Sequence, residues 1–236
     1  MVSWLDFWNS DNPIYVNERH RAVHYRQLAE EIASILLDGA PRVLDFGCGD
    51  ALSADIVADR AGRLLLCDGA ERVRARLATR FAGHPRIAVV SPDDVATLPD
   101  ASLDLVVANS VVQYMTRPEL DAFLALAHAK LQPYGCLLLG DIVPPSVGPA
   151  TDATALLRLG WQNGFLAAAT VGLARTFFSS YRATRATLGL LHLDERELSE
   201  MLTRAGYASE RQPRNLGHNQ ARMTFAAMKC RPAATE

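Results

Sequence analysis

A glycine pair flanked by acidic residues lies near the start of the chain, in the string VLDFGCGD over residues 43–50. The apolar run 42–46 predicts a short buried strand, and Gly47 and Gly49 follow it. Glycine lets a backbone turn tightly and lets a ligand come close, and the helix expected after the turn offers free N–H groups at its start. Asp45 precedes the first glycine by two residues. The string therefore predicts a ligand-binding turn at the end of a strand.

Spacing separates two classes of ligand for such a turn. The nicotinamide-dinucleotide fingerprint needs a third glycine three residues after the second, and Leu52 occupies that position. Asp68 lies 21 residues after Gly47 and ends a second apolar run, 63–67. A carboxylate there can accept hydrogen bonds from both hydroxyls of a ribose. The missing third glycine therefore disfavours a nicotinamide dinucleotide at this turn.

Alternating strands and helices must position these residues. Expected strands alternate with expected helices of 10–15 residues, which predicts βαβ units, a parallel sheet and right-handed crossovers. A long helix precedes them, from a cap at Asn17 to about Leu37. Two strands close the chain, over 207–216 and 222–230. The alternating strands are 42–46, 63–67, 86–90, 103–108 and 135–142, and the helices between them are 52–61, 70–81 and 117–131.

These motifs resemble those of class I S-adenosylmethionine (SAM)-dependent methyltransferases. DFGCG is similar to the family's first motif, and LLLCDGA to its second. SPDDVATLPD and the segment 109–114 resemble its third and fourth motifs, LQPYGCLLLGDIVPP resembles its fifth strand, and the late AGY also matches. The resemblance covers 42–145 and the last 45 residues, but not 146–192.

The resemblance implies a set of cofactor contacts. Asp45, Gly47 and Gly49 would cradle the methionine part of SAM, and Asp68 would take the ribose. Asp94 and the Val95 backbone would contact the adenine, with Asp93 as the competing choice. The further expected contacts are Gly69, Asn109 and Tyr15, the last because the family's N-terminal segment often closes over the cofactor.

The family implies one domain over 1–236. Its fold would be a doubly wound, Rossmann-like α/β sheet of seven mostly parallel strands with an antiparallel last strand, plus an N-terminal helix and a helical insertion after strand 5. We divide it into a cap segment (1–41), a SAM-binding core (42–145), a helical insertion (146–192) and a closing helix and hairpin (193–236).

Candidate catalytic residues follow the carboxyl ends of the strands, where open α/β sheets bind ligands. The turn between the last two strands carries His218, which would take a proton from a hydroxyl acceptor. An ordinary polar hairpin turn is the competing interpretation. His24 and Asp141 are alternatives for the base.

Composition excludes several classes. With 49% hydrophobic residues the chain is not disordered, and 24 Lys and Arg against 26 Asp and Glu argue against a basic nucleic-acid surface. The four cysteines form no CxxC pair, and His20 and His24 lack a further ligand at a recognisable spacing, so we expect no metal. The N-terminus has no signal-peptide pattern and no apolar run spans a bilayer, which favours a cytoplasmic protein.

Residues 146–192 are rich in Leu, Ala and Phe with interspersed Arg, and they predict helices over about 152–161, 165–178 and 181–190. Three roles stay open: an apolar lid over the substrate, peripheral membrane contact through 152–190, or packing on the sheet edge or a second subunit, as monomer or homodimer. We predict a SAM-dependent methyltransferase acting on an oxygen of a small-molecule, apolar or lipid-like acceptor, with S-adenosylhomocysteine as product. The alternative is a SAM- or nucleotide-binding protein without methyl transfer.

Overall fold

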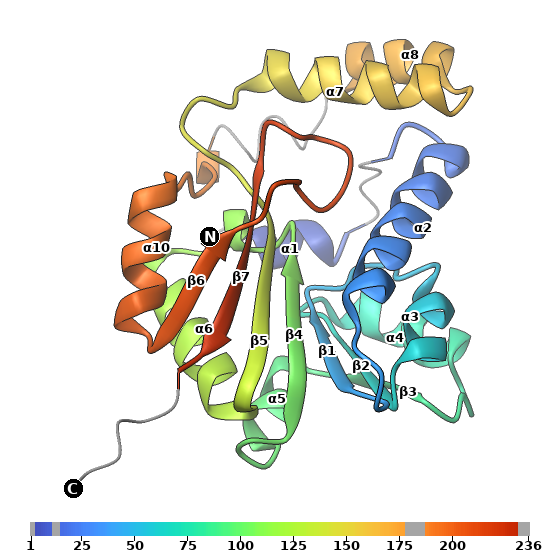
Figure 1. Cartoon of the computed structure of the whole chain (residues 1–236). Helices are drawn as coiled ribbons and strands as arrows, with labels where there is room; N and C mark the ends of the chain where they lie inside the picture. Colours follow the sequence, from blue (N-terminus) through green and yellow to red (C-terminus); the bar gives the residue numbers. More distant parts are fainter. Residues whose placement is uncertain (1–2, 11–14, 178–186, 231–236) are drawn as a thin grey trace, which may run out of the picture.

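The computed structural model describes residues 3–10, 15–177 and 187–230. Its centre is a seven-stranded sheet in the order β3-β2-β1-β4-β5-β7-β6, parallel except for β7, which runs antiparallel to both neighbours (Figure 1). The strands are β1 (Arg42–Phe46), β2 (Arg63–Cys67), β3 (Ile87–Val90), β4 (Leu103–Asn109), β5 (Leu131–Ile142), β6 (Tyr207–Arg211) and β7 (Met223–Lys229). The predicted fold class is confirmed.

Helices cover both faces of this sheet. On one face α2, α3 and α4 pack through residues such as Ile32, Val57 and Leu77, and on the other α5, α6 and α10 contribute Val95, Phe123 and others. The helix bounds are α1 (Trp4–Trp8), α2 (Glu18–Ile35), α3 (Ala54–Arg60), α4 (Glu71–Arg80), α5 (Pro92–Thr97), a 3-10 turn (Val112–Tyr114), α6 (Arg117–Lys130), α7 (Pro149–Gln162), α8 (Leu166–Phe177) and α10 (Glu195–Arg204).

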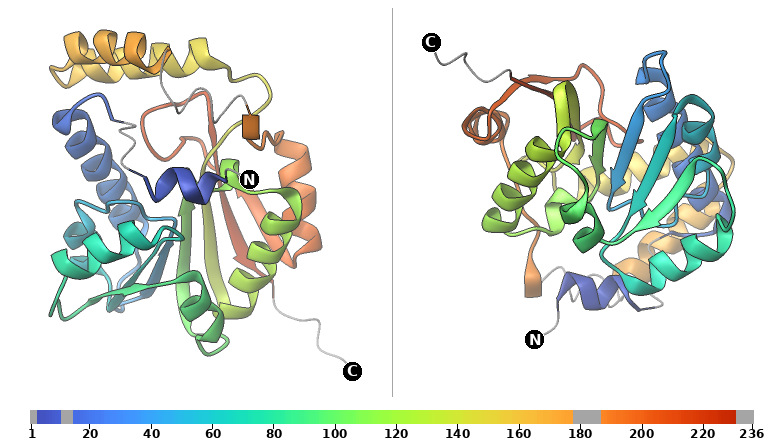
Figure 2. Two further views of the ribbon diagram at one scale, coloured as in Figure 1. Left: turned by 180° about the vertical axis from the view of Figure 1, so that it is seen from behind. Right: turned by 90° about the horizontal axis from the view of Figure 1, so that it is seen from below.

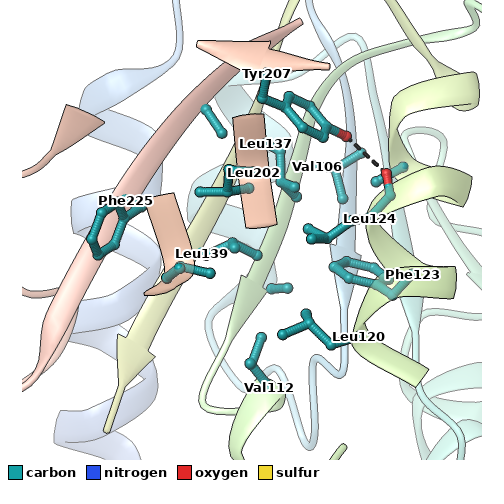
Figure 3. Close-up of a cluster of buried hydrophobic side chains, with 14 of the residues drawn as sticks. Val106, Val112, Leu120, Phe123, Leu124, Leu137, Leu139, Leu202, Tyr207 and Phe225 are labelled. Carbon is teal, nitrogen blue, oxygen red and sulfur yellow. Dashed lines mark hydrogen bonds between the residues drawn. The ribbon is translucent and has the colours of Figure 1, made fainter. Parts of the chain in front are cut away.

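The central strands are nearly continuous apolar runs because both of their faces are buried. Val106, Leu137 and Leu139 of β4 and β5 meet Leu120 and its neighbours on α6 (Figure 3). The Tyr207 hydroxyl, at the start of β6, donates a hydrogen bond of 3.2 Å to the Leu124 carbonyl oxygen. This core fixes the positions of the strand ends, the edge at which open α/β sheets in general bind ligands.

Several element boundaries differ from the sequence-based expectations. Helices α1 and α5 were not predicted, although each begins with a capping box, Ser3 with Asp6 and Ser91 with Asp94. Strand β6 ends at Arg211, so a long connection rather than a tight hairpin turn leads to β7. The third expected insertion helix falls mostly outside the described residues.

Helices α7 and α8 lie across the carboxyl ends of the strands, above the start of α2 (Figures 1 and 2). Leu159, Phe165 and Ala169 form a small core there with Val16 and Val23. The Arg19 side chain of α2 donates from Nε to the Asn163 carbonyl oxygen at 2.5 Å. In the part of the chain that is described, no helix combines the length and the apolarity needed to cross a bilayer.

Candidate functional site

The turn after β1 is held so tightly that its two glycines are required. Gly47 and Gly49 have φ of +77° and +57°, in the left-handed region that favours glycine. A Cβ on Gly47 would lie 2.7 Å from Val111 Cγ2, and one on Gly49 would lie 2.6 Å from the Tyr25 hydroxyl oxygen. The turn therefore passes between α2 and the segment that follows β4, and neither glycine position has room for a side chain.

Asp68, at the end of β2, faces this turn. Its Oδ2 accepts a hydrogen bond from Gly49 N at 3.0 Å and its Oδ1 one from Ala70 N at 2.8 Å. Burial raises the pKa of Asp68, and the two backbone donors oppose that rise. Each oxygen keeps acceptor capacity, because a carboxylate offers about four lone-pair sites. The carboxylate can therefore receive two further donors.

Asp45 lies beside Asp68 and lacks such donors. Among the described residues, none donates a hydrogen bond to the Asp45 carboxyl group, and its side chain lines a cavity of about 20 Å³ with Tyr25 and Cys48. Burial, and then the nearby Asp68 charge, raise the pKa of Asp45 to about 7. A cationic ligand next to Asp45 would favour its ionised form.

Asp94 caps α5. Its Oδ2 accepts from Ser91 N at 2.8 Å and from Ser91 Oγ at 2.7 Å, and these bonds lower the pKa of the exposed Asp94 carboxyl group. The Val95 N–H donates to the Ser91 carbonyl oxygen within the first turn. Both of these bonds are made to Oδ2, and no residue that the structure describes donates a hydrogen bond to Asp94 Oδ1.

Helix α1 lies over the segments that follow β2 and β4. Leu5 Cδ1 would lie 3.2 Å from a Cβ placed on Gly69. The rings of Trp4 and Trp8 lie 4.6 Å and 5.4 Å, centroid to centroid, from Tyr114, which follows β4. An apolar and aromatic wall therefore stands over the end of β2.

The segment after β4 and the end of β5 are joined by polar contacts. Asn109 Nδ2 donates to Ser110 Oγ at 3.2 Å, and Ser110 Oγ donates to Asp141 Oδ2 at 2.7 Å. Asn109 Oδ1 is buried with no hydrogen-bond partner among the described residues. Ser110 and Asp141 both adopt positive φ, +57° and +61°. Strained backbone of this kind persists where the surroundings hold it in place.

Asp141 is fully engaged by other groups. Arg222 NH1 donates to Asp141 Oδ2 at 2.6 Å and Asn215 Nδ2 donates to Asp141 Oδ1 at 3.2 Å, in addition to the Ser110 bond. These contacts join the end of β5 to the segment after β4 and to the β6–β7 connection. The role of Asp141 as a base stays a prediction.

The N-terminal aromatic residues and the histidines lie together beside the glycine turn. Tyr15 shares a hydrogen bond with Tyr25, whose hydroxyl accepts from Asp50 N at 2.8 Å. The Tyr15 ring lies 5.6 Å from that of His24, and burial raises the pKa of Tyr15 to about 12. Tyr15 thus links the glycine turn to the histidines.

Two of these imidazoles have unused ring nitrogens. Neither His24 nor His218 makes a hydrogen bond to another residue within the described part of the chain. Burial, then the charge of His218, lower the pKa of His24 to about 4, and burial lowers the pKa of His218. Both rings are therefore neutral at pH 7. His20, on α2, faces the insertion, where its ring stacks on that of Phe165 with the centroids 5.3 Å apart.

The site residues predicted from the sequence thus fall into two groups at one edge. The first surrounds the glycine turn, and the second lies between α2 and the β6–β7 connection. Within the described ranges, no cluster of three or more His, Cys, Asp or Glu side chains could hold a metal ion. Sequence reasoning missed Glu31, Asp152 and Arg222. It placed Ser110, Gln113 and Asn215 among the candidate segments and Tyr25 on the first helix, but it did not predict their long-range contacts.

Known proteins share the glycine-turn region. A family model described as a methyltransferase domain matches residues 43–135. An uncharacterized methyltransferase of Mycobacterium tuberculosis is 32% identical over 127 residues, which are 53% of this chain and 61% of that protein. A probable S-adenosylmethionine-dependent methyltransferase of Mycolicibacterium smegmatis is 31% identical over 139 residues, 58% of this chain and 49% of that protein.

The fold is also shared with solved structures. Magnesium protoporphyrin IX methyltransferase from Synechocystis, with bound S-adenosylhomocysteine, superposes with a TM-score of 0.58 at 15% identity, covering 96% of this chain and 92% of that one. At that identity the likeness shows the fold alone. The chain spans 61% and 49% of the length of the two curated relatives.

Proposed function

We propose that this chain, whose residues 43–135 match a family model described as a methyltransferase domain, binds SAM and transfers its methyl group to an oxygen of a small molecule. The observation that carries the proposal is the Asp68 carboxylate, held by Gly49 N and Ala70 N at the end of β2 with acceptor capacity left on both oxygens. Its place beside the glycine turn suits a ribose.

The residues around the turn fit SAM. Asp68 would accept from the two ribose hydroxyls, and the bare backbone at Gly47 and Gly49 would lie against the methionine part. Asp45 would offset the positive charge of the sulfonium, and Asp94 Oδ1 would accept from the adenine amine. When bound, SAM would supply an electrophilic methyl group to the acceptor oxygen, and its sulfur, freed of the methyl and of the positive charge, would remain as the thioether of S-adenosylhomocysteine.

The chain's own residues would supply position and a proton acceptor. Holding the methyl donor and the acceptor in line makes a bimolecular step effectively unimolecular, and this accounts for much of the acceleration of such a reaction. His218 would take the proton of the acceptor hydroxyl on an unprotonated ring nitrogen, because its lowered pKa keeps the imidazole neutral at pH 7. His24, which lies on α2 and is also neutral at pH 7, is the alternative base.

The charges on the acceptor side favour an uncharged acceptor. Arg222 is paired with two carboxylates, Asp141 and Asp152, and Arg21 with Asp50 and Glu18, so neither arginine is left to attract an anion. Between these ion pairs lie the neutral imidazoles of His24 and His218 and the ring of Tyr15, which together form the acceptor wall. An apolar molecule with a hydroxyl group suits such a wall better than an anion does.

Methyl transfer separates this proposal from a SAM-binding protein without catalysis. We would incubate the protein with SAM labelled in its methyl group and a fractionated pool of uncharged, anionic and cationic hydroxylated small molecules. Label appearing in an uncharged product, with stoichiometric S-adenosylhomocysteine, is the expected result. SAM binding with no transfer to any fraction would favour the alternative.

A further inference from the structure

The connection that carries His218 is braced far more than a hairpin turn needs. Gly217 N donates to Glu31 Oε2 of α2 at 2.7 Å, and Leu216 N donates to Thr224 Oγ1 at 2.8 Å. The Asn215 backbone N–H donates to Gln220 Oε1 at 3.0 Å, and Gln220 Nε2 donates to the Asn215 carbonyl oxygen at 3.1 Å. These side-chain contacts hold the backbone on either side of His218, whose own ring they leave free.

The helical insertion supplies one of the braces. Asp152 Oδ1, on α7, accepts from Arg222 NH2 and from Asn219 Nδ2, each at 2.9 Å. Asn219 directly follows His218 in the chain. One carboxylate of the insertion thus holds both the residue after His218 and the end of the connection.

Arg222 carries this brace to the strand ends. Its NH1 donates to Asp141 Oδ2 at 2.6 Å and to Gln113 Oε1 at 3.1 Å. The side chains of Arg222, Asp141 and Asp152 are only 13%, 14% and 23% exposed. Hydrogen bonds between charged groups are roughly twice as strong as those between neutral groups, so this cluster strongly favours one arrangement of the segments that it joins.

The same charges surround the His218 ring. Asp141 and Asp152 favour its protonated form and Arg222 opposes it, while burial lowers its pKa. From α2, the His20 ring lies 6.3 Å away, centroid to centroid, and His24 also faces it; both are neutral at pH 7. Moving the insertion would therefore change both the place of the imidazole and its basicity.

We infer that Asp152 is a positioning residue of the insertion: through Asn219 and Arg222 it fixes the connection that carries His218, so that docking of α7 sets the proton acceptor. The inference rests on the proposed function of His218. It makes the insertion a part of the catalytic apparatus rather than a cover alone.

Hydrogen exchange of the whole chain tests the bracing. Asp152→Asn keeps the size of the side chain and removes its charge, and Asp121→Asn, an exposed carboxylate on α6, is the matched control. We expect amides of residues 215–222 to exchange at least about tenfold faster in Asp152→Asn, because the buried Arg222 loses a charged partner. Asp152→Glu, which keeps the charge, should stay closer to the unmodified protein. Unchanged exchange in Asp152→Asn would overturn the inference.

Nuclear magnetic resonance of the imidazole gives a second readout. The pKa of His218, assigned with His218→Gln, should change in Asp152→Asn and stay unchanged in Asp121→Asn, because both the burial of the ring and the charge of Asp152 act on it. An unchanged pKa in Asp152→Asn would also overturn the inference. Calorimetric titration with SAM is run in parallel: if SAM fails to bind the unmodified chain, the proposed function fails, whatever the exchange result.

Discussion

Two neighbouring carboxyl groups, Asp45 and Asp68, differ in how well the surrounding protein stabilises their ionised form. Asp68 accepts two backbone hydrogen bonds, which support its ionised form against burial. Asp45 has burial and the charge of Asp68 acting on it, both of which raise its pKa, to about 7. In the free protein Asp45 is therefore half protonated near neutral pH. A cation bound next to Asp45 would lower its pKa and so favour the ionised form.

This difference makes SAM affinity depend on pH. A cationic ligand favours ionised Asp45, so binding releases a proton below pH 7 and releases none well above it. We expect the affinity for SAM to rise between pH 6 and 7.5, by less than about tenfold per pH unit for one proton, and then to level off. Calorimetric titration across this range measures it.

Asp45→Asn is the matched variant for that experiment. It keeps the shape of the side chain without the titrating proton, so its SAM affinity should be weaker and nearly independent of pH over the same range. Equal slopes in the two proteins would show that Asp45 is not the group that responds to the cofactor.

At the scale of elements, the strands and the glycine turn were predictable because their signals are local. The apolar runs of β1, β2 and β4 and the string DFGCG each lie within a few residues. The supports of the site are not local: Tyr25 meets Asp50, Glu31 meets Gly217, and Asp152 meets Arg222. No spacing rule links such pairs, because only the packed sheet brings them together.

The contact between α2 and the glycine turn can be tested with two glycines of similar conformation. Gly49→Ala would force a left-handed alanine and place its Cβ 2.6 Å from the Tyr25 hydroxyl oxygen. We expect it to lower the free energy of unfolding by more than the ~1–2 kcal/mol of the backbone conformation alone, and to weaken SAM binding. Urea unfolding and SAM titration measure the two effects.

Gly83→Ala is the control. Gly83 has φ of +74°, but a Cβ there would meet nothing within 4 Å. This variant should lose only the conformational part of the stability and bind SAM as the unmodified chain does. If both variants behave alike, the close approach of α2 to the turn has no importance for the site.

At the scale of the whole molecule, segments from both ends of the chain meet over the sheet edge (Figure 2). Helix α1 covers the end of β2, and α7 and α8 lie above α2 and the β6–β7 connection. The insertion packs on α2 and binds the connection through Asp152, so its position above the site is built into the fold. Membrane contact stays a prediction, for which exposed Trp161 and Arg158 are the candidates.

The tryptophans report on this cover. Trp4 and Trp8 contact Tyr114 beside the expected cofactor site, whereas Trp161 is 75% exposed on α7. We expect SAM to change the intrinsic fluorescence of the unmodified chain and of Trp161→Phe to a similar extent. The change should largely disappear in the Trp4→Phe/Trp8→Phe double variant. A response that follows Trp161 instead would mean that α1 does not cover the cofactor.

The central claim is that SAM binds at the carboxyl end of β2 with its ribose on Asp68, and calorimetric titration of Asp68→Ala with SAM tests it most directly. Hydrogen bonds to a charged group contribute about 1.5–3 kcal/mol each, so we predict at least a tenfold loss of affinity relative to the unmodified chain. Asp59→Ala, an exposed carboxylate on α3, controls for charge, and thermal unfolding confirms that each variant is folded. Equal SAM affinity in folded Asp68→Ala and in the unmodified chain would contradict the account.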